Sequence, residues 1–154
     1  LLAALDGCGS TIVKLEDPPT PTKITRLLAA RSGLTVFGGL GGVSAFWELR
    51  RGAAGTMTGF AFPEILRELR IQMEKGDLAS AAAIFDRYLP YIAYEGQPVV
   101  GLGIRKEVLR RRSAIATARA RTARPLEADG LAELDDVLAR VDISATRAPF
   151  EVGA

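Results

Sequence analysis

Short apolar runs and stretches with helical spacing alternate along the first half of the chain. The runs at 11–14, 34–37 and 55–59 are bounded by glycine or proline and predict strands. Between them, apolar residues recur every three or four positions and predict helices at about 20–32, 43–51 and 62–75. Strands that alternate with helices predict a parallel sheet with right-handed crossovers, so we expect an α/β fold.

The second half of the chain has helical periodicity only. Asp77 is placed to cap a helix that runs to about Glu95, another is expected from Gln97-Pro98 into an arginine-rich cluster, and a last one at 132–141. The first six residues are typical of the end of a helix. Three parallel strands leave two open sheet edges, which predicts either dimerisation or further strands supplied by a longer protein. The first residue, Leu1, is not methionine and favours a piece of a longer or processed protein.

Lys14 is an unexpected residue within the first strand. Burial of an ammonium group is costly unless the group is paired or loses its proton. In parallel β/α proteins, functional groups collect at the carboxyl ends of strands, and Lys14 has that position. Gly38-Gly39 and Thr58-Gly59-Phe60 have the same position on the next two strands and would face the same mouth. An apolar pocket would favour the free amine of Lys14, a nucleophile, whereas a lysine that reaches into solvent is the structural alternative.

The composition excludes several kinds of catalytic site, metal site and partner. The 154 residues are 48% hydrophobic and 25% charged, as in an ordinary globular domain, and the net charge of +2 does not argue for a polyanionic partner. The chain has no histidine, which excludes histidine-based triads and most zinc sites, so we expect no metal. The single Cys8 cannot form an internal disulfide, which is compatible with the cytoplasm. Charged residues interrupt every apolar run, so we expect no membrane span.

Four motifs carry a family resemblance. They read IVK, FGGLGG, RGAAGTMTGFAFPE and LPYIAYEGQPVVGLGIRKEVLRRR, and with them residues 1 to about 115 resemble the dihydrodipicolinate synthase/N-acetylneuraminate lyase family. The resemblance implies a segment of a TIM (β/α)8 barrel with about three parallel strands, followed by a C-terminal helical extension. Residues 1–76 would then be the C-terminal part of the barrel, and residues 77–154 its last helix and the helical region.

The resemblance implies a Schiff-base lyase or aldolase that acts on pyruvate or a related 2-oxo acid. Lys14 falls on the family's Schiff-base lysine, and Gly39, Met57 and Thr58 fall on residues near the substrate. No cofactor is implied, and the family suggests a homo-oligomer. The family's catalytic tyrosine lies in the first half of the barrel and has no counterpart here. Leu15 stands where many members have an acidic residue, which favours an oxo acid other than the usual substrate of lysine biosynthesis.

Three alternatives remain at this point. The arginine-rich run at 104–124 would suit nucleic acid, but no aromatic residue is interleaved with it, so we expect a solvated helix face. The glycine-rich loops could offer backbone N–H groups to phosphate, a function that would not need Lys14. The chain could also be a non-catalytic fragment that self-associates through its sheet edge.

Overall fold

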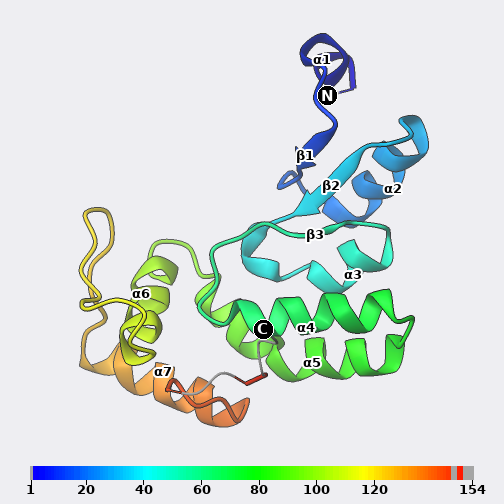
Figure 1. Cartoon of the computed structure of the whole chain (residues 1–154). Coiled ribbons are helices and arrows are strands. Elements are labelled where there is room, and N and C mark those ends of the chain that lie inside the picture. The colour runs from blue at the N-terminus through cyan, green and yellow to red at the C-terminus, as the bar shows by residue number, and fades with distance from the viewer. Residues whose placement is uncertain (1, 147–148, 151–154) are drawn as a thin grey trace.

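A computed structural model describes residues 2–146, 149 and 150 of the chain (Figure 1). In chain order its elements are α1 (Leu2–Cys8), β1 (Ile12–Lys14), α2 (Thr20–Ala30), β2 (Thr35–Gly38), the 3-10 turn η1 (Leu40–Gly42), α3 (Ala45–Arg50), β3 (Gly55–Thr56), α4 (Pro63–Glu74), α5 (Leu78–Glu95), α6 (Gly101–Arg111) and α7 (Ala128–Arg140). The alternation of strands and helices, followed by helices alone, is as predicted. None of the described helices is both long enough and apolar enough to cross a membrane.

The three strands form one parallel sheet in the order β1-β2-β3. Val13 is opposite Val36 in the first pair, and Gly38 is opposite Thr56 in the second. Each strand is joined to the next by a segment that contains a helix, as parallel pairing requires. The carboxyl ends of all three strands therefore lie along one edge of the sheet.

The two faces of the sheet have different environments. Val13 and Val36 are buried on the face that packs against Ile24 and Leu27 of α2. Because side chains alternate along a strand, Ile12 and Lys14 lie on the opposite face, where Ile12 is 59% exposed. In a closed barrel that face lines the interior. The described residues thus form one sector of a barrel, with its inner face open.

A second, larger core joins the helices of the second half. Helices α4 and α5 lie side by side (Figure 1), and α5 also packs against α6 and α7. The most deeply buried side chains in this core come from four helices and the loop after β3: Phe62, Ile65, Leu69, Tyr91, Ile92, Ile104, Val108 and Leu134. Asp77 caps α5 as predicted, because its carboxylate accepts the N–H of Ser80 at 3.0 Å.

Some element boundaries differ from the prediction. β3 ends at Thr56 and not at 59, because its pairing with β2 stops where β2 ends. The helix expected at Gln97-Pro98 begins at Gly101, since Val99 has a φ of 71° and cannot continue a right-handed helix. Two further helices are longer than expected: α1 continues to Cys8, and α7 begins at residue 128 and not at 132.

Candidate functional site

The structure brings the predicted site residues to one edge of the sheet. Lys14 is the last residue of β1, Gly39 follows β2, and Met57 and Thr58 follow β3. Two hydrogen bonds tie the loops together there: the N–H of Met57 donates to the carbonyl of Gly38, and the N–H of Gly41 donates to Oγ1 of Thr58, both at 2.9 Å. Met57 and Thr58 therefore belong to a loop and not to the strand expected at 55–59.

The surroundings of Lys14 differ from the expected apolar pocket. Its side chain is 38% exposed, and Nζ lies 3.0 Å from Oε2 of Glu16. The difference follows from strand alternation, because Val13 takes the packed face and Lys14 takes the open one. Lys14 is thus an accessible, ion-paired amine at the carboxyl end of a barrel strand.

Both carboxylate oxygens of Glu16 have an interaction partner. Oε2 faces Lys14, and Oε1 accepts the N–H of Leu40 at 2.9 Å. The Leu40 N–H, and after it the Lys14 ammonium, hold the pKa of the Glu16 carboxyl below its usual value. A Cβ at position 39 would lie 2.2 Å from Oε1 of Glu16, so glycine at this position makes room for the carboxylate. The resemblance puts Gly39 near the substrate, and in this structure the Glu16 side chain fills the space beside it.

The glycine-rich loop after β2 has few free donors. The N–H groups of Leu40 and Gly41 donate to the Glu16 carboxylate and to the Thr58 hydroxyl. Those of the next two residues donate to carbonyls within the loop, at 2.9 and 3.4 Å. A phosphate cradle needs several N–H groups that point at the ligand. Residues 40–43 offer none, so the loop after β2 does not by itself form a phosphate cradle.

Glu48 is a buried acid that the sequence reasoning missed. It lies on α3 with 0% exposure, and its Oε1 accepts the hydroxyl of Thr20 at 2.5 Å. Its Oε2 has no hydrogen-bond partner and lies against Gly38, where a Cβ would be 1.7 Å away. Burial, the largest cause, and the negative charge of Glu16 raise the pKa of the Glu48 carboxyl. A carboxyl group packed behind the Gly38-Gly39 pair thus supports the strand end from the helix side.

The loop after β3 is fixed by the helices of the second half. The Ala61 N–H donates to Oε2 of Glu95 at 3.0 Å, and the Ala61 carbonyl accepts a hydrogen bond from Arg112. Glu95 is 1% exposed and also accepts hydrogen bonds from the Tyr91 hydroxyl at 2.8 Å and from Nε of Arg105 at 2.6 Å. Both polar groups of Ala61 are therefore held by side chains of α5 and of the end of α6. We call this arrangement the Ala61 clamp.

Three contacts extend the Ala61 clamp. Arg112 pairs with Glu64 at 2.6 Å and lies over the ring of Phe62 at 4.7 Å. A Cβ on Gly59 would lie 2.2 Å from Nη1 of Arg105, so the loop passes directly over that guanidinium group. Tyr91 serves this network as a buried donor, and burial raises the pKa of its hydroxyl.

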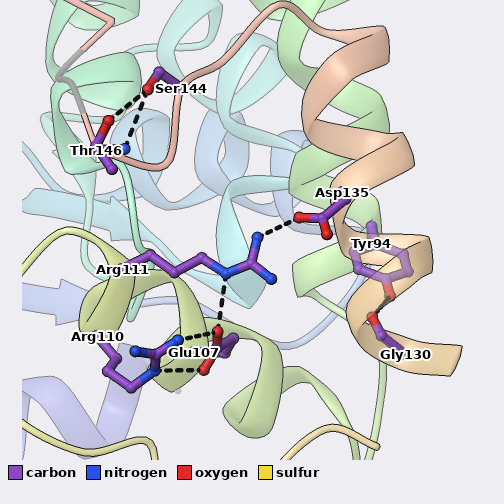
Figure 2. Close-up of polar contacts among 8 residues, drawn as sticks. All are labelled: Tyr94, Glu107, Arg110, Arg111, Gly130, Asp135, Ser144 and Thr146. Carbon is purple, nitrogen blue, oxygen red and sulfur yellow. Dashed lines mark hydrogen bonds and ion pairs between the residues drawn. The ribbon is translucent and has the colours of Figure 1, made fainter. Parts of the chain in front are cut away.

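Two residues of the arginine-rich run, Arg110 and Arg111, are paired with acidic side chains within the protein (Figure 2). Arg110 donates to both oxygens of Glu107, at 2.9 and 2.7 Å, and Arg111 bridges Glu107 at 2.8 Å to Asp135 of α7. The hydrogen bonds from Arg110, followed by those from Arg111, lower the pKa of Glu107 to about 2. Arg111 thus joins α6 to α7, and Arg110 is engaged within α6, which favours the structural interpretation of these arginines over nucleic-acid binding.

Other kinds of site find little support among residues 2–146, 149 and 150. No group of three or more cysteine or acidic side chains there could hold a metal ion. A pocket of 430 Å³ lies between β3 and α4, lined among others by Thr56, Thr58 and Arg70. Its lining does not include Lys14, so it does not contain the proposed nucleophile.

Comparisons with known proteins give matches among solved structures. No family model matches the chain, and no curated protein sequence does. The crystal structure of dihydrodipicolinate synthase from Rhodopseudomonas palustris is 34% identical with a TM-score of 0.78, over 84% of this chain and 45% of that one. A structure described as the first monomeric dihydrodipicolinate synthase variant shares the fold at 20% identity, with a TM-score of 0.74, over 93% of this chain and 49% of that one. The chain spans less than half the length of either.

Proposed function

We propose, from the premise that this chain is a partial dihydrodipicolinate synthase-family fold, that it takes part in Schiff-base chemistry on a 2-oxo acid. The family resemblance and the fold class, a partial β/α barrel followed by helices, agree with the sequence prediction and are confirmed. The observation that carries the functional proposal is the position of Lys14. It is an accessible amine at the carboxyl end of a barrel strand, where the resemblance puts the Schiff-base lysine.

The proposed chemistry begins with the free amine of Lys14. It attacks the carbonyl carbon of pyruvate or a related 2-oxo acid, and the carbinolamine takes up a proton from the solvent and loses water to give an iminium ion. The iminium withdraws electrons from the adjacent carbon, which permits cleavage or formation of a carbon–carbon bond. No organic cofactor or metal is required by this route. In this proposal Gly39, Met57 and Thr58 lie around the bound oxo acid, with the loop hydrogen bonds that fix their backbone as support.

The proposal also covers the domain organisation, the oligomeric state and the cellular location. Residues 1–76 form the barrel part, and residues 77–154 the last barrel helix and the helical region, with the turn at Gly76-Asp77 as the boundary. By the family resemblance, a homo-oligomer in the cytoplasm belongs to the same proposal. The family implies an acid/base residue and hydroxyl groups that bind the carboxylate of the 2-oxo acid. Neither has a counterpart in these 154 residues. Acid/base assistance is worth about 10²–10⁴-fold, so we expect weak turnover from these 154 residues.

Borohydride trapping tests the proposal. The chain is incubated with pyruvate, reduced with sodium borohydride and digested, and the modified peptide is identified by mass spectrometry. We expect the reduced adduct on Lys14, its loss in Lys14→Ala, and no change in Lys23→Ala, which removes a half-buried lysine paired with Asp17. An adduct spread evenly over several lysines, or none at all, would contradict the assignment of Lys14.

A further inference from the structure

Glu48 is an acidic residue buried on the helix side of the sheet edge. Its side chain has 0% exposure, and Oε1 lies 2.5 Å from the Thr20 hydroxyl. Oε2 has no hydrogen-bond partner in the part of the chain that the structure describes, and it lies against the backbone of Gly38. Among the described residues no ion pair includes Glu48, so its carboxyl group has one polar contact and no cation partner there.

The neutral acid fits these surroundings better than the carboxylate does. A buried negative charge with a single hydrogen bond and no cation is costly. A carboxylic acid has one O–H group, and at Oε1 of Glu48 this group can donate to Oγ1 of Thr20, so the proton has a partner and no charge is buried. Burial, the largest cause, raises the pKa of the Glu48 carboxyl, the Thr20 hydrogen bond lowers it, and the negative charge of Glu16 raises it further.

The backbone beside Glu48 connects it to the Lys14 site. The Gly38 carbonyl accepts an N–H of the loop after β3 at 2.9 Å, and the side chain of Glu16, the partner of Lys14, lies across Gly39. The glycine pair Gly38-Gly39 has no side chains and separates the two carboxyl groups. A carboxylate at Glu48 needs water or further N–H donors, and it gains them when the packing at this pair opens. Repulsion from Glu16 favours the same movement.

We propose that Glu48 is a positioning residue for the Lys14 site and holds Gly38-Gly39 in place as a neutral acid. Loss of its proton displaces the glycine pair and lowers adduct formation on Lys14. The inference rests on the proposed function and adds an upper pH limit to it. The groups that act on the Glu48 carboxyl are the Thr20 hydroxyl of α2 and the Glu16 carboxylate of the loop after β1. Among the described residues, the other elements packed against α3 contribute none.

Two measurements test the proposal, each on the unaltered chain and on Glu48→Gln between about pH 5 and pH 9. The first is the folding equilibrium constant from urea unfolding, and the second is the rate of borohydride trapping of pyruvate on Lys14. Glutamine has the shape of the neutral acid, accepts the Thr20 hydroxyl and carries no charge at any pH. Each result is expressed as the ratio of the unaltered chain to Glu48→Gln, because the ionisation of Lys14 itself affects both proteins alike. The control is Asp17→Asn, which removes an exposed carboxylate from the loop after β1.

We expect the folding ratio to fall about tenfold per pH unit above 4.5, since the unfolded chain loses the Glu48 proton there while the folded chain keeps it. The fall ends at the pH where the folded chain also loses the proton. From that pH upward the trapping ratio should fall, by up to about tenfold per pH unit. Asp17→Asn should show the same two changes as the unaltered chain.

A folding ratio that does not change with pH overturns the neutral acid. A fall that continues to the highest pH contradicts the pH limit, and a trapping ratio that stays constant where the folding ratio levels off refutes the link to Lys14. If the unaltered chain forms no adduct on Lys14, the proposed function fails and the link with it, while urea unfolding still decides whether Glu48 is neutral. If Glu48→Gln does not fold, carbon-13 NMR of the Glu48 carboxyl gives the pH of proton loss, and trapping by the unaltered chain without a break at that pH overturns the proposal.

Discussion

Replacement of Gly38 by alanine tests the packing behind the sheet edge. The new Cβ would lie 1.7 Å from Oε2 of Glu48 and 2.4 Å from its Cδ, well inside any contact distance. The Glu48 side chain has 0% exposure and a hydrogen bond from Thr20, so it cannot turn into solvent. Overpacking of this kind costs about 1–3 kcal/mol, and the displaced hydrogen bond about 1 kcal/mol more. We expect Gly38→Ala to lower the free energy of unfolding by about 2–4 kcal/mol.

The assay is urea unfolding followed by circular dichroism, in a double-mutant cycle with Glu48. Glu48→Ala removes the atoms that clash, so adding Gly38→Ala to that variant should cost less than about 0.5 kcal/mol. Glu48→Gln keeps the volume and removes the charge, and in that background Gly38→Ala should cost as much as in the unaltered chain. If Gly38→Ala is equally costly beside Ala and beside Glu at position 48, the clash is not the cause and the reasoning fails.

Two further predictions concern the helical half. Glu107→Gln should cost about 1–3 kcal/mol near neutral pH. The pKa of Glu107 is lowered to about 2, so its stabilisation is present above pH 4.5 and is lost as the pH falls toward 2. Urea midpoints should therefore fall more steeply in that range for the unaltered chain than for the variant, and equal slopes would contradict the pairing. Glu95→Ala should cost about 3–5 kcal/mol and speed hydrogen exchange at the Ala61 amide, whereas Glu133→Ala, an exposed control, should do neither. An Ala61 amide that exchanges as slowly without the Glu95 carboxylate would refute the Ala61 clamp.

The parts of the fold that depend on local sequence were predicted well. Asp77 caps α5 because its carboxylate and the N–H it accepts are three residues apart, a relation visible in the sequence. The end of β3 at Thr56 was missed, because it depends on where β2 ends across the sheet. The start of α6 was missed because the left-handed φ of Val99 is a tertiary requirement and not a residue preference.

In the candidate site, too, features that depend on local sequence were predicted, and features that depend on tertiary packing were missed. The position of Lys14 at a strand end followed from the alternation of strands and helices. Its ion pair could have been suspected, since Glu16 is two residues away on the same face of an extended chain. The burial of Glu48 was harder to predict from the sequence. The buried residues of α3 are Ala45, Phe46 and Glu48, whereas Trp47 is 50% exposed. Which residues of α3 are buried is decided by the packing of α2 and α3 against the strand end.

The Ala61 clamp has a consequence for how this scaffold could be diversified. The loop after β3 takes its position from Glu95 and Arg112, which lie 34 and 51 residues farther along the chain. Substitutions at such positions can shift the loop while every side chain next to Lys14 stays the same. A mutational library aimed at this edge of the sheet should therefore include α5 and α6 as well as the strand ends, because residues far from Lys14 in the sequence set the position of the loop after β3.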